Sequence, residues 1–130
     1  MSTIFTVSDY NQLLTLHRAV MEAKFSELPN DTVLIGSRLL AETSNQIVDT
    51  LSQWEIARGR PEKYEQWEKW RAIDESRREW NIAVQHVKGL GNIWDSWSTL
   101  EKEAYIRIII SPFEVDNLLI QKFLETVNNK

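Results

Sequence analysis

The sequence contains no cysteine, and this absence removes several kinds of chemistry. Without a thiol, the chain can form no disulfide, use no cysteine nucleophile and hold no metal through thiolate ligands. A chain without disulfides suits a reducing compartment, and we therefore expect a cytoplasmic protein. The only histidines are His17 and His86, and no glutamate lies three residues before either of them. Because helical carboxylate–histidine sites need that spacing, we expect no metal site.

Breaks and long apolar runs are also scarce. The 130 residues include only four glycines and three prolines, which favours long helices over many short strands. No run of 18 apolar residues occurs, so we expect no membrane span. The first ten residues, MSTIFTVSDY, lack the basic region and the apolar run of a signal peptide.

Positive charge is in deficit, with a formal net charge of −4. Binding to nucleic acid or to an anionic membrane needs a basic face. The longest basic run is Arg77-Arg78, which lies between Glu75 and Glu79. We therefore expect neither nucleic acid nor membrane as a partner.

Motifs that carry catalysis are missing as well. The chain has no Gly-x-Ser-x-Gly, no P-loop and no dinucleotide-binding glycine pattern. A catalytic carboxylate pair needs one acid in apolar surroundings, whereas most acids here neighbour a lysine or arginine. We therefore expect a protein that is not an enzyme, with no catalytic residue and no cofactor.

The most informative stretch that is present runs from Pro61 to Val87. Its apolar residues recur at helical steps and include Trp67, Trp70 and Trp80. On the other face, acids precede bases by three or four residues, which is the favourable order in a helix. This pattern predicts one helix of about 27 residues, roughly 40 Å long at 1.5 Å per residue. Trp80 lies in the middle of the apolar stripe and is expected in the core.

Similar periodicity predicts helices on both sides of this stretch. The first follows a cap at Ser8 or Asp9 and ends before Pro29. A second extends to Arg58, and we favour a start at Asp31 or Thr32 with a weak first turn. The alternative is a break at Gly36 and a helix that starts at Ser37. A fourth begins at the capping-box pattern Ser98-Thr99-Leu100-Glu101, although residues 106–110 are β-branched and suit a strand equally well. The last covers 115–127.

These elements predict a single all-α domain over residues 1–130. We expect an antiparallel bundle of about five helices, three of them long, because the links between them are short. Residues 1–7 are expected as a short strand or an extended arm, and residues 128–130 as a frayed tail.

The six tryptophans are the one unusual feature of the composition. Most of them suit a core, but tryptophan and arginine also dominate protein interfaces. We therefore expect a non-catalytic protein that binds another protein, as a regulator, adaptor or immunity-type inhibitor, or binds a second copy of itself as a homodimer. The alternative is a small-molecule sensor or enzyme with an aromatic pocket between helices. The candidate partner-binding residues are Trp67, Trp70, Arg71, Arg77 and Arg78.

Overall fold

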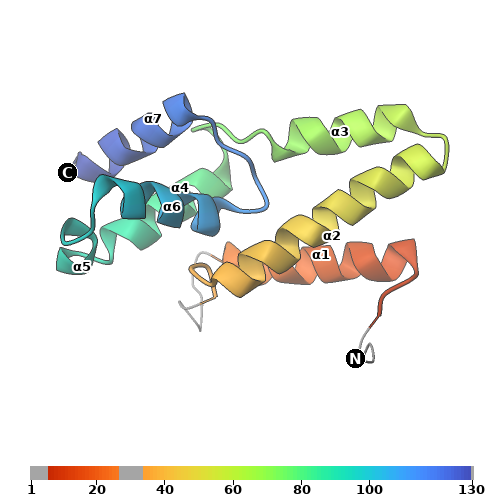
Figure 1. Cartoon of the computed structure of the whole chain (residues 1–130), viewed down its shortest axis with the longest axis horizontal. Helices are drawn as coiled ribbons and strands as arrows, with labels where there is room; N and C mark the ends of the chain where they lie inside the picture. Colours follow the sequence, from red (N-terminus) through yellow and green to blue (C-terminus); the bar gives the residue numbers. More distant parts are fainter. Residues whose placement is uncertain (1–5, 27–33, 130) are drawn as a thin grey trace.

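The computed structural model describes residues 6–26 and 34–129, and these residues are helical apart from short connections (Figure 1). The all-α prediction is confirmed. Within the described ranges there are seven helices rather than about five. They are α1 (Tyr10–Lys24), α2 (Arg38–Ala57), α3 (Pro61–Arg71), α4 (Arg78–Lys88), α5 (Asn92–Asp95), α6 (Thr99–Ile110) and α7 (Asn117–Asn128).

The long helix predicted for residues 61–87 is wrong, because the chain leaves the helix after Arg71 and re-enters it at Arg78. Ala72 is extended, and Ile73 after it is buried in the core. Asp74 then accepts hydrogen bonds from the backbone N–H of Ser76, at 2.9 Å, and from its hydroxyl. Such a local bond offers the backbone a turn in place of the helix. In a continuous helix Asp74 would pair with Arg78, four residues later, but a turn takes the place of that pair.

Several boundaries agree with the sequence analysis. Asp9 caps α1 by accepting from the Gln12 N–H, and the capping box of Ser98 and Glu101 is present at the start of α6. Gly59 has a φ of 75°, the left-handed conformation that ends α2 without strain.

Two open alternatives are also decided. Residues 106–110 belong to helix α6, so the strand is wrong. Ser37 caps α2, which begins at Arg38, so the favoured start of this helix at Asp31 or Thr32 is wrong and the alternative break at Gly36 is confirmed. The residues Asp31 and Thr32, and most of the expected arm at 1–7, lie outside the described residues. The expected tail differs from the structure in that Asn128 still belongs to α7.

The helices pack as two groups, each with its own core. In the first group, α2 packs against both α1 and α3. Its buried centre is small and consists of Leu13 and Val20 from α1 with Ile47 and Leu51 from α2.

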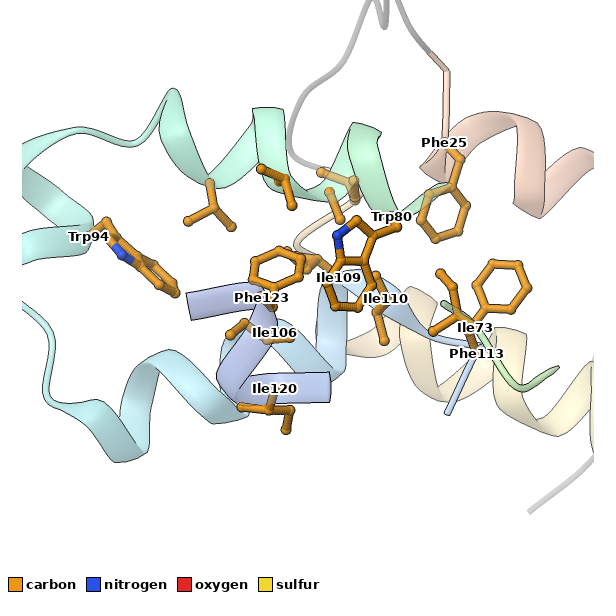
Figure 2. Close-up of a cluster of buried hydrophobic side chains, with 14 residues drawn as sticks. Phe25, Ile73, Trp80, Trp94, Ile106, Ile109, Ile110, Phe113, Ile120 and Phe123 are labelled. Carbon is orange, nitrogen blue, oxygen red and sulfur yellow. The ribbon is translucent and has the colours of Figure 1, made fainter. Parts of the chain in front are cut away.

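The second group contains α4 to α7 and the larger core (Figure 2). Here α4 packs against α6 and α7. Trp80, only 3 % exposed, contacts Phe123 edge to face with ring centroids 5.2 Å apart. Its predicted burial is confirmed. Phe25, Ile35 and Ile73 extend this core toward the first group.

Two buried cations join the groups. Lys24, at the end of α1, donates from Nζ to the carbonyl oxygens of Ile108 at 3.0 Å and of Ser111 at 2.5 Å. Arg71, at the end of α3, donates from Nε to the carbonyl oxygen of Pro112 at 3.0 Å. Both cations thus bind backbone carbonyl oxygens where α6 ends, a position that favours positive charge. We call Lys24, Arg71 and residues 108–114 the junction.

Candidate ligand-binding site

A cavity of about 430 Å³ lies between α1, α2 and α3. This volume falls within the range of roughly 300–1,000 Å³ that is usual for small-molecule sites. We call it the aromatic pocket. Its lining comprises Tyr10, Leu14, His17, Arg18, Glu55, Lys63, Gln66, Trp67 and Trp70.

Helical spacing explains why these residues share one cavity. The α1 residues Tyr10, Leu14 and His17 follow steps of four and three, which place them on one side of a helix. The α3 wall repeats this spacing, with Trp67 and Trp70 in its second half. From α2, Glu55 contributes the one acidic side chain of the lining. Two helices therefore form the walls, and the third brings a carboxylate between them.

The wall beside His17 consists of three rings in mutual edge contact. The His17 ring centroid lies 5.4 Å from that of Trp67 and 5.1 Å from that of Trp70. The two tryptophan rings are 5.6 Å apart with an interplanar angle of 82°. Since edge-to-face contacts are the favoured aromatic geometry, the three rings stabilise one another.

Two of the lining residues each have a buried polar atom that has no hydrogen-bond partner among the residues that the structure describes. They are Oε2 of Glu55 and Nδ1 of His17. Glu55 is only 2 % exposed and His17 only 7 % exposed. An unsatisfied buried polar group costs about 1–3 kcal/mol, and native proteins contain few of them. Because neither atom is accessible, both lie behind the wall of the pocket rather than on its surface.

The surroundings change the acid–base behaviour of two lining residues. Burial, with a smaller contribution from the Arg18 charge, lowers the pKa of His17 to about 4, so its imidazole is neutral at pH 7. Burial also raises the pKa of Tyr10, and Glu55 raises it further as a hydrogen-bond acceptor and as a negative charge. The hydroxyl of Tyr10 therefore keeps its proton at neutral pH.

The five candidate residues from the sequence analysis do not form one surface. Trp67 and Trp70 are half-buried and line the aromatic pocket. Arg71 is buried in the junction, where it also bonds Asn45 and Asp49 of α2. Arg77 lies over the Trp70 ring, 5.6 Å from its centroid, and donates to the Trp70 carbonyl oxygen. Arg78 is exposed on α4 and donates to the carbonyl oxygen of Phe25.

Sequence reasoning did not name Glu55, Tyr10 or His17 among its candidate binding residues. A signal for Glu55 was present, because it follows Val48 by seven residues and Leu51 by four. It therefore lies on the buried face of α2. An acid on such a face is unusual and marks a site worth testing.

A second cavity, of about 510 Å³, adjoins the junction and includes Asn45, Asp49, Arg71 and Arg107 in its lining. Its polar groups bond one another across the junction, which gives them a structural use.

Among the residues that the structure describes, no cluster of three potential metal ligands occurs. In the same ranges, none of the helices has the length and apolarity needed to cross a membrane.

Comparison with known proteins gives no relative on which a function could rest. No protein-family model, no curated protein and no solved structure matches this chain.

Proposed function

We propose that this protein is a non-catalytic binding protein whose ligand is a small organic molecule held in the aromatic pocket. The observation that carries the proposal is the cavity itself, which Tyr10, Trp67 and Trp70 line together with the largely buried residues Glu55 and His17. Aromatic walls with a few convergent polar groups are typical of small-molecule sites.

The geometry supports this alternative better than docking of a whole protein. Docking through Trp67 and Trp70 would be favoured by an exposed, convex aromatic surface. Both rings instead lie half-buried against His17, and Trp70 also packs on Phe113 at 4.6 Å. The rings thus have intramolecular neighbours on one side and the cavity on the other.

Binding without catalysis fits the chemistry of the lining. Among the described lining residues there is no serine, threonine or cysteine to serve as a nucleophile. With a pKa of about 4, His17 would be a weak base at neutral pH. These groups are suited to hydrogen bonding rather than to proton transfer.

Isotope-labelled protein titrated with neutral, cationic and anionic aromatic fragments tests the proposal. We expect at least one fragment to shift backbone amide signals of residues 10–18 and 63–70. The Leu14→Trp variant, which fills the cavity, should lose that response while its circular dichroism stays helical. Leu118→Trp, the same change at an exposed position on α7, is the control. The proposal fails if no fragment shifts these signals or if Leu14→Trp responds like the native protein.

A further inference from the structure

The charge that the aromatic pocket offers to a ligand is positive. The exposed residues of its lining are Arg18, Lys63 and Gln66, and none of the three is acidic. We call them the rim. The described residues place no carboxylate within ion-pair distance of either rim cation. The rim is thus basic and unneutralised, although the chain as a whole has a formal net charge of −4.

Glu55, the one acid of the lining, offers no acceptor to a ligand. Its Oε2 atom is inaccessible, and the Tyr10 hydroxyl bonds the carboxyl group. Its charge nevertheless limits how much negative charge the pocket can hold. With a pKa of about 4, His17 is neutral at pH 7, so two rim cations and one carboxylate leave an excess of one positive charge. This balance favours a ligand with a single negative charge.

Helical spacing places the rim cations beside the apolar walls. Arg18 follows Leu14 by four residues on α1, and Lys63 precedes Trp67 by four residues on α3. Residues four apart are neighbours on the surface of a helix. The charge of Arg18 also acts inside the pocket, since it contributes to the lowered pKa of His17, whose ring contacts Trp67. A ligand with its acidic group at the rim therefore has its apolar part next to these walls.

The two parts of the lining call for two parts of a ligand. Guanidinium and ammonium groups only donate hydrogen bonds, and a carboxylate is a strong acceptor for both. Leu14, Trp67 and Trp70 form an apolar and aromatic surface against which a flat ring can pack. The cavity of about 430 Å³ has room for one such ring with its acidic group.

We infer that the ligand of the aromatic pocket is an aromatic carboxylic acid, bound as its anion, with its carboxylate at Arg18 and Lys63 and its ring between α1 and α3. This inference rests on the proposed function, because it names the ligand class of the same pocket. The acid is recognised by its charge at the rim, and the ring is recognised by its shape and apolar surface.

Calorimetric titration with three forms of one probe tests the sign of the charge. The probes are 3-phenylpropanoate, which is an anion, 3-phenylpropanamide, which is neutral, and 3-phenylpropylamine, which is a cation. We expect the acid to bind most tightly and the amine least. The amide should have a Kd about three- to twentyfold higher than the acid, the effect expected for two exposed ion contacts. Higher ionic strength should weaken the acid and not the amide. Acetate, which lacks the ring, should not bind detectably.

Matched variants place the carboxylate. Arg18→Gln and Lys63→Gln should each raise the Kd of 3-phenylpropanoate about two- to fivefold and leave that of the amide unchanged. Arg38→Gln and Lys88→Gln remove the same charges at exposed positions outside the lining and should have no effect. Circular dichroism of each variant checks that the fold is kept.

The outcomes separate the inference from the proposed function. If the amide or the amine binds as tightly as the acid, or if either rim variant binds the acid like its control, the carboxylate site is refuted. If acetate binds as tightly as 3-phenylpropanoate, the ring site is refuted. If none of these probes binds while another aromatic fragment shifts the signals of residues 10–18, the inference is wrong and the proposed function stands. If the wider fragment set also fails, both are wrong.

Discussion

Replacement of Lys24 by methionine should remove a rise in stability that the native protein shows between pH 7 and pH 9. Burial lowers the pKa of Lys24 to about 7, although its two carbonyl acceptors favour the ammonium form. In the unfolded chain the pKa of a lysine is about 10.4. Between these two values the unfolded state binds a proton that the folded state does not, so the free energy of unfolding increases with pH.

The size of the effect follows from the two pKa values. With 1.36 kcal/mol for each pKa unit, the increase from pH 7 to pH 9 is about 2 kcal/mol. Burial lowers the pKa values of His17 and His86 and raises those of Tyr10 and Tyr105, so these shifts move the four groups away from the interval in which Lys24 titrates. The interval therefore isolates Lys24 among the described groups with shifted pKa values.

Urea denaturation at pH 7, 8 and 9 measures this increase. The Lys24→Met variant keeps the length of the side chain and has no titrating group, so its free energy of unfolding should be flat over the same interval. The exposed Lys88→Met is the control and should retain the increase. A native protein without the rise, or a Lys24→Met variant with the same rise, would refute the reasoning.

Three further predictions concern the cores and the pocket. Trp80→Ala should lower the free energy of unfolding by about 3–5 kcal/mol, because the indole is buried against Phe123. Chemical denaturation measures this loss, and a value below about 1 kcal/mol would contradict the prediction. His17→Gln should reduce the loss of stability on acidification from pH 6.5 to pH 4 by about 2–3 kcal/mol, because unfolded His17 gains a proton that the folded form, with its lowered pKa, does not. Equal acid profiles for variant and native protein would contradict this prediction. Gly36→Ala should cost about 1–3 kcal/mol, because an added Cβ would lie 2.5 Å from the Tyr105 hydroxyl. Tyr105→Phe in the same chain should restore part of that loss in thermal unfolding, and no restoration would show that the clash is not the cause.

The sequence was sufficient for helices whose ends carry local signals. The side chains of Asp9 and Ser98 cap helices where the spacing predicted them, and Gly59 ends α2. These signals act within one helical turn, so they are readable without knowledge of the tertiary contacts.

The break between α3 and α4 could not be predicted from periodicity, because the apolar spacing continues across it. What interrupts the helix is the burial of Ile73 in the second core together with the turn at Asp74. Both depend on helices that are distant in sequence. The Asp74-x-Ser76 pattern was a local signal, but the acid–base spacing to Arg78 suggested a helix instead.

The candidate site was predicted in part for a similar reason. An unusual number of tryptophans directed attention to Trp67 and Trp70, which line the aromatic pocket. The importance of Glu55 depends on how deeply α1 and α3 cover it, and such cover is a tertiary property. Its place on an apolar face was nevertheless visible in the spacing.

The junction has a consequence for the width of the aromatic pocket. The two walls are α1 and α3, and each is tied at its carboxyl-terminal end to the same short piece of chain, α1 through Lys24 and α3 through Arg71. A shift of residues 108–112 would therefore move the carboxyl-terminal ends of α1 and α3 together and change the distance between the two walls. If the pocket binds a ligand as proposed, we expect substitutions in residues 108–112, which do not line it, to change the affinity from a distance.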